Sequence, residues 1–123
     1  MADPRQEFAQ VLNRIVRSDG VEGAEIMRRD GQCVAEAFRP DMDLPTYSRL
    51  SAALALAGEN SLPEMRASRS RRLVTKADRH RVVVVEANDR LLVAALVQPE
   101  GAADRLLRLV EDAAADINKM TAA

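Results

Sequence analysis

The sequence predicts an α+β domain whose elements follow the order helix, two strands, helix, three strands, helix. Apolar residues recur at helical spacing near both ends of the chain. The dipeptide Asp30-Gly31 separates two short strand-like segments, and three further strand-like runs precede the last helix. With 123 residues, of which 47% are hydrophobic and 30% charged, the chain has the size and composition of one globular domain spanning residues 1–123.

The first helix is expected over about residues 4 to 18. Asp3 suits the N-cap, and Pro4 suits the first helical position. Gly20 is well placed to end the helix, because glycine adopts the left-handed conformation at low cost. The apolar positions at helical spacing are Phe8, Val11, Leu12, Ile15 and Val16.

A β-hairpin is expected next, formed by residues 23–29 and 32–38. The turn between them contains Asp30-Gly31, which suits the positive φ angles of a tight hairpin. Cys33, the single cysteine, lies beside Val34 and Ala35 in the second strand. This setting is typical of a small buried hydrophobe rather than of an activated thiol.

The second helix is predicted over residues 47–59, which contain strong helix formers and no β-branched residue. Gly58, Asn60 and Pro63 disfavour its continuation, so we expect a kink or a restart near residue 60. Residues 52–58 carry no polar side chain, and such a helix is expected to be buried on more than one side.

Three strands are expected at residues 71–77, 82–87 and 91–98, joined by short polar turns into an antiparallel meander. The second and third of these runs show no polar alternation, so both of their faces should be covered and they should be central. A final helix follows, with an apolar face made of Leu106, Leu109, Val110, Ala113 and Ile117.

Overall charge and composition disfavour several classes of function. A formal net charge of -1 gives no general attraction to nucleic acid or to an anionic membrane. The only aromatic residues are Phe8, Phe38 and Tyr47, so a base-stacking platform is missing and no nucleic-acid partner is expected. The absence of a signal peptide and of an apolar run of about 18 residues predicts a cytoplasmic protein without membrane insertion.

Neither catalysis nor cofactor binding is expected. The sequence contains no GxxxxGK[ST], GxGxxG, HExxH or GxSxG motif. The single histidine, His80, lies in a predicted exposed turn, with no Cys, Asp or Glu at a recognised ligand spacing. We therefore predict no catalytic, cofactor-binding or metal-binding residues, and a protein that is not an enzyme.

The element order, together with Gly20-Val21-Glu22-Gly23-Ala24 after the first helix and Arg29-Asp30-Gly31 in the first turn, resembles the roadblock family over about residues 7–118. The resemblance implies a roadblock/profilin-like fold with a five-stranded antiparallel sheet in the order 2-1-5-4-3. The first and third helices would lie on one face and the second helix on the other. It also implies a homodimer that regulates a Ras-like small GTPase, as bacterial gliding-motility GTPase-activating proteins do, without supplying an arginine finger.

In the implied dimer, the third strand pairs with its symmetry mate and the two copies of the second helix pack antiparallel. Ser51, Ala55 and Gly58 would form a small-residue strip that permits close helix contact, and a second copy would also satisfy the open edge of the third strand. Two alternatives stay open: the alanine content reflects helix propensity alone, or basic neighbours keep the edge monomeric. The expected interface residues are Tyr47, Ser51, Leu54, Ala55, Gly58, Arg71, Leu73, Val74 and Thr75.

Residues 66–81 contain seven basic residues and one acidic residue, a local charge of +6. This segment is either a docking surface for an acidic partner or a solvated turn and strand edge. Its candidate partner-binding residues are Arg66, Arg69 and Arg72. Two other functions remain as alternatives to GTPase regulation: a structural adaptor similar to the dynein-associated branch of the family, and a small-ligand sensor, which the shortage of aromatic residues disfavours.

Overall fold

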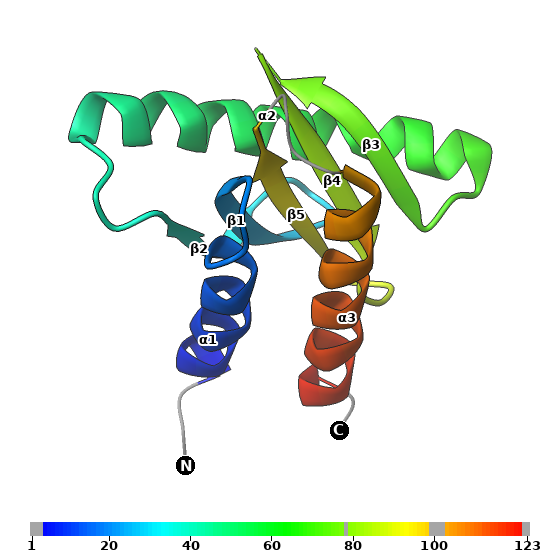
Figure 1. The fold of residues 1–123 in the computed structure, drawn as a ribbon. Coiled ribbons are helices and arrows are strands. Elements are labelled where there is room, and N and C mark those ends of the chain that lie inside the picture. Colours follow the sequence, from blue (N-terminus) through cyan, green and yellow to red (C-terminus); the bar gives the residue numbers. More distant parts are fainter. Residues whose placement is uncertain (1–3, 78, 99–102, 122–123) are drawn as a thin grey trace.

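The computed structural model describes residues 4–77, 79–98 and 103–121, and it has the predicted order of elements (Figure 1). Three helices and five strands are present in these residues. Their bounds are α1 Pro4–Val16, β1 Val21–Arg28, β2 Cys33–Phe38, α2 Leu44–Ser68, β3 Arg72–Ala77, β4 His80–Glu86, β5 Leu91–Val97 and α3 Ala103–Thr121.

The five strands form one antiparallel sheet in the order β2-β1-β5-β4-β3, which confirms the predicted topology. β5 lies in the centre and every residue of it is buried. β4 is also interior, and its four valines are buried. The two runs without polar alternation are therefore interior strands, as expected, because each is covered on both faces. β2 and β3 form the two edges of the sheet.

Two hydrophobic clusters lie on opposite faces of the sheet. α1 and α3 cover one face, where Leu12, Ile15 and Ile117 pack on Ile26 and Val93. α2 covers the other face alone (Figure 1). On that side the cluster contains Leu50, Leu54, Ala57, Met65, Met27, Val82, Val84, Leu92, Ala94 and Leu96. The alternation of side chains along β1 and β4 sends successive residues into the two layers.

α1 and α3 lie side by side and run in opposite directions, so the start of α1 and the end of α3 meet at the same end of the molecule (Figure 1). Arg14 on α1 and Asp116 on α3 form an ion pair with a nitrogen–oxygen distance of 2.9 Å. Both side chains are exposed enough that the pair contributes little to stability. No helix among the described residues is long and apolar enough to cross a membrane.

α2 is longer than the sequence predicted, and it is continuous through residue 60, so the expected restart there is wrong. Asp43 caps its N-terminus by accepting a hydrogen bond from the Thr46 backbone N–H at 2.8 Å. The helix then continues through Gly58 and Pro63 to Ser68. Tertiary packing explains the continuation, because buried residues on both sides of Pro63, Ser61 and Met65, hold the second half of the helix on the sheet.

Smaller differences occur at other ends of elements. α1 ends at Val16, two residues earlier than expected, and Gly20 follows with a positive φ of 88°. His80 is half-buried in β4, paired with Ala77, rather than exposed in a turn. Residue 78 of that predicted turn, like Asp3 of the predicted N-cap, lies outside the described residues.

A β-bulge interrupts the hairpin of β1 and β2. Glu25 pairs with Glu36, and Ile26 pairs with Ala35, but Met27 then pairs with Cys33. One residue, Val34, is therefore extra on β2, and it packs on the α1 side of the sheet together with Ala35. As a result Cys33 shares the α2 side with Glu25 and Glu36, a placement that regular alternation would not give.

Candidate functional site

The outward side of α2 is the first candidate surface. Leu56 lies near the middle of the helix and is 58% exposed, and Ala52, one turn earlier, is also exposed. Leu54 and Ala57 point to the sheet, so the helix has an apolar inner side and a partly apolar outer side. An exposed leucine beside a small residue permits close approach of another helix, which the Ala-rich sequence had suggested.

The open edge of β3 is the second candidate surface. β3 pairs with β4 along one side, and no other strand of the described residues pairs with it. Val74 is 43% exposed at this edge, while Leu73 is half-buried and packs in the α2 layer. The main-chain groups that face away from β4 are available to another strand.

Several basic residues lie in the segment of the chain that joins these two surfaces, from the end of α2 to the start of β3. Arg66 and Arg69 are exposed at the end of α2, where Arg69 caps the helix with a φ of 55°. Arg71 is exposed immediately before β3. Arg72 differs from the others because it forms an ion pair with Glu111 of α3, with a nitrogen–oxygen distance of 2.7 Å. The predicted partner-binding arginines therefore do not form one set: Arg66 and Arg69 lie on the α2 side, and Arg72 lies against α3.

The expected interface residues on α2 differ in how deeply they are buried. Leu54 is fully buried, and Gly58 is also buried, so close to Met27 that a Cβ at this position would collide with the Met27 Sδ atom. Both face the sheet of their own chain and have no surface for a partner. Tyr47 and Ser51 are half-buried and contact Glu36 on β2. Ala55 is half-buried, so within the expected strip of Ser51, Ala55 and Gly58 only Gly58 is buried by this chain itself.

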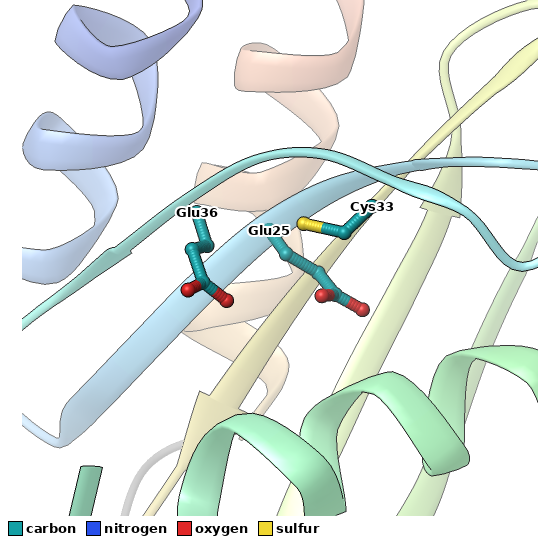
Figure 2. Close-up of side chains that lie close together, drawn as sticks. All are labelled: Glu25, Cys33 and Glu36. Carbon is teal, nitrogen blue, oxygen red and sulfur yellow. The ribbon is translucent and has the colours of Figure 1, made fainter. Parts of the chain in front are cut away.

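A polar cluster that was not predicted from the sequence lies beneath the N-terminal half of α2. Glu25 on β1 is 1% exposed, and its Oε1 has no hydrogen-bond partner among the described residues. Glu36 on β2 accepts hydrogen bonds from the hydroxyls of Tyr47 and Ser51, the latter at 3.0 Å. Figure 2 shows Glu25, Cys33 and Glu36 side by side, with both carboxylates directed toward α2.

This environment changes the acidity of the cluster. Burial raises the pKa of Glu25 to about 7, and the negative charges of Glu36 and Glu59 add to the effect, while a hydrogen bond from Cys33 opposes it. Partial burial of its sulfur also raises the pKa of the Cys33 thiol to about 11, with the two carboxylates acting in the same direction. The hydrogen bond to Glu36 raises the pKa of Tyr47. The protonated forms of Glu25 and Cys33 are favoured first by burial and then by the neighbouring negative charges.

The prediction for Cys33 is wrong in one respect, since the residue is exposed rather than buried. β2 is an edge strand, so one side of its first residue is uncovered. The sequence contained one signal for the polar cluster that the prediction missed. It was Glu25 itself, a charged residue inside an otherwise apolar run of an interior strand. Its position two residues from Met27 places both on the α2 side of the sheet.

The sheet order and the two helical layers define the fold as a roadblock/profilin-like α+β fold. The model of the Roadblock/LC7 domain family matches residues 7–96. The chain belongs to the Roadblock/LC7 family, as the resemblance implied. A comparison with curated protein sequences gives no significant match.

Solved structures support the same fold. MglB in a tetrameric arrangement superposes with a TM-score of 0.74 at 16% identity, covering 98% of this chain and 91% of that one. The gliding protein MglB from Thermus thermophilus gives 0.74 at 15% identity, with 98% and 92% covered. MglC from Myxococcus xanthus gives 0.74 at 14% identity, with 91% and 97% covered. At these identities the likeness establishes a shared fold.

Proposed function

We propose that two copies of this chain form a homodimer, and that the dimer binds a Ras-like small GTPase and modulates its nucleotide cycle. The observation that carries the proposal is the partly apolar outer side of α2, centred on Leu56, in a chain that also has an open β3 edge. No catalytic residue of this chain takes part in the proposed function. The GTPase itself hydrolyses GTP, and the dimer binds the GTPase and modulates its nucleotide cycle.

The proposed contact between copies differs from the first expectation at α2. Ala52 and Leu56 replace Leu54 and Gly58, because only the former pair is exposed. A leucine in the middle of a helix–helix contact loses most of its exposed apolar surface, and burial of a leucine contributes about 1.5–3 kcal/mol. Ala52 allows the two helices to approach closely in the same region.

At β3, the proposed partner is the same strand of the second copy. Antiparallel pairing of two β3 strands would join the two sheets and satisfy the backbone groups that face away from β4. Val74 and Thr75 lie in the middle of β3 and are the residues that we place at this junction. Arg71 lies at its border.

The GTPase is proposed from the family, and its docking surface from charge. Arg66 and Arg69 are exposed at the end of α2, roughly 15–20 Å along the helix from Leu56, and they suit an acidic surface on a partner. The structural likeness to the gliding protein MglB supports a regulator of the gliding-motility type. A cytoplasmic location follows from such a partner.

The hydrolysis rate of the cognate GTPase tests the proposed regulation directly. Adding this protein in excess should change the rate of GTP hydrolysis several-fold, because a regulator must stabilise one arrangement of the switch loops over the others. Binding of the GTP-bound and GDP-bound forms is measured in parallel. Binding without any change in rate would assign the adaptor function instead, and no binding in either state would refute both.

Substitution of Leu56 by arginine is expected to convert the dimer into a monomer. The guanidinium group would be buried and unpaired at the centre of the proposed helix contact, which costs several kcal/mol. Light scattering after gel filtration at tens of micromolar measures the mass.

Met120→Arg is the matched control, because Met120 is 41% exposed on α3, in the layer on the other face of the sheet. This variant should remain dimeric. A Leu56→Arg variant that keeps the mass of the unsubstituted protein would exclude α2 as the contact.

A further inference from the structure

We propose that Glu25, Cys33 and Glu36 form a binding site for a divalent transition-metal ion, best fitted by Zn²⁺, beneath the N-terminal half of α2. One ligand atom from each residue lies within 4.8 Å of the other two. The site is formed by β1 and β2, at the opposite edge of the sheet from β3. Its three ligands lie away from the β3 edge, while the hydroxyls of Tyr47 and Ser51 that contact Glu36 come from the same helix as the proposed dimer contact.

The cross-strand register brings the two carboxylates together. Glu25 and Glu36 are direct partners in the β1–β2 ladder and lie on the same side of the sheet (Figure 2). Like charges directly opposite each other destabilise a strand pair. A bound cation would turn this repulsion into attraction to a shared ion.

Burial of Glu25 is the second and independent observation. The residue is 1% exposed, and its Oε1 is enclosed without a hydrogen-bond partner among the described residues. A buried carboxylate oxygen without a partner is costly, and a metal ion is one of the groups that satisfies it. The charges that act on Glu25 come from Glu36 and Glu59, and both are negative.

The bulge at Val34 supplies the third ligand. It brings Cys33 to the same side of the sheet as the two carboxylates, and Figure 2 shows its sulfur between them and the β2 backbone. Bulges often re-aim one side chain next to a functional site. Because Cys33 is exposed, the ion also has a path from solvent to the site.

Two hydroxyl groups on α2 orient the ligand Glu36. Tyr47 and Ser51 both donate hydrogen bonds to its carboxylate, each from the N-terminal half of the helix. Hydrogen bonds to a ligating carboxylate fix its direction and tune the metal site. A bound ion would thus connect β1, β2 and α2 through ligands and their hydrogen-bond donors.

The donor set selects the ion. A thiolate with two carboxylates suits Zn²⁺ and similar transition metals, whereas Mg²⁺ and Ca²⁺ prefer oxygen ligands alone. Metal–ligand bonds of about 2.0–2.3 Å in a tetrahedral zinc site place the ligand atoms roughly 3.5 Å apart, so movements of about 1 Å would close the present site. Water would complete the coordination, and Cys33 would release its thiol proton on binding.

Cobalt titration of the full-length, tag-free, reduced protein tests the site. The chain has one cysteine, so a thiolate-to-cobalt charge-transfer band can only come from Cys33. We expect a band that saturates at one Co²⁺ per chain and is displaced by Zn²⁺. Cys33→Ser should abolish it. No band, or saturation at one ion per two chains, would overturn the proposed site.

Zinc affinity of carboxylate variants provides the second measurement. Glu25→Gln and Glu36→Gln should each weaken Zn²⁺ binding at least tenfold in competition with a chromophoric chelator. Glu64→Gln, which changes an exposed carboxylate on α2, should leave the affinity unchanged. Circular dichroism in EDTA checks that each variant folds. Equal affinity in Glu25→Gln and the unsubstituted protein would contradict the proposal.

The alkylation rate of Cys33 gives a readout that does not depend on the chelator. Saturating Zn²⁺ should change the rate of reaction of Cys33 with iodoacetamide at least tenfold, because it replaces a protonated thiol by a metal-bound thiolate that is less accessible. The same addition should have little effect in Glu25→Gln. An alkylation rate that Zn²⁺ leaves unchanged in the unsubstituted protein would count against coordination by Cys33.

Discussion

Glu25→Gln is expected to stabilise the metal-free protein at pH 8 by up to about 3 kcal/mol. Burial and the neighbouring carboxylates raise the pKa of Glu25 in the folded protein from 4.5 to about 7. Each pKa unit corresponds to about 1.4 kcal/mol, which sets the upper limit of the effect. Glutamine resembles the protonated carboxyl group and is uncharged at every pH, so it avoids the cost of a buried carboxylate.

The direction of the pH dependence follows from this raised pKa. Between pH 4.5 and 7, the folded protein holds a proton on Glu25 that the unfolded chain has released. The free energy of unfolding therefore decreases as the pH rises through this window, and it becomes constant above about pH 7. The groups that face Glu25 are Cys33 and Glu36 from β2 and Glu59 from α2.

Urea denaturation at pH 5 and pH 8, with EDTA present, measures the effect. The difference between Glu25→Gln and the unsubstituted protein should be much larger at pH 8 than at pH 5. Glu64→Gln controls for the loss of a carboxylate in general, since Glu64 is exposed. If the free energies of unfolding of Glu25→Gln and of the unsubstituted protein differ by the same amount at pH 5 and at pH 8, Glu25 does not titrate as its burial indicates.

Leu54→Ala is expected to lower the free energy of unfolding by about 3 kcal/mol. Leu54 is fully buried between α2 and the sheet, in contact with the cluster that contains Leu92 and Leu96. Removing its side chain beyond Cβ leaves a cavity that the packed sheet cannot fill.

Leu44→Ala is the matched control on the same helix, because Leu44 is 73% exposed at the start of α2. It should change the free energy of unfolding by less than about 0.5 kcal/mol. Urea denaturation of both variants at one protein concentration compares them. Similar losses in the two variants would contradict the inner and outer sides assigned to α2.

Much of the fold could be predicted from the sequence because its local signals agree with one another. The Asp30-Gly31 turn, the apolar periodicity of α1 and α3, and the absence of alternation in β4 and β5 each indicate the structure that is found. The sheet order came from the family resemblance, since spacing alone does not fix strand order. α2 exceeded its prediction because packing on the sheet outweighed the local preferences of Gly58 and Pro63.

The candidate sites were less predictable, because they depend on which side of an element each residue faces. The predicted outer strip of α2 included Gly58, which packs on Met27, and it left out Leu56, the most exposed leucine in the middle of the helix. The polar cluster depends on a one-residue bulge at Val34, which no local motif indicates. Without the bulge, Cys33 and Glu36 would be assigned to opposite sides of the sheet.

The mass of the complex with the cognate GTPase, loaded with a non-hydrolysable GTP analogue, tests the proposed platform most directly. Light scattering should give a single species that contains two copies of this chain together with the GTPase. Leu56→Arg should remove that species while Met120→Arg preserves it. Separate elution of the GTPase and this protein, or a complex with only one copy of this chain, would contradict a dimeric GTPase-binding platform.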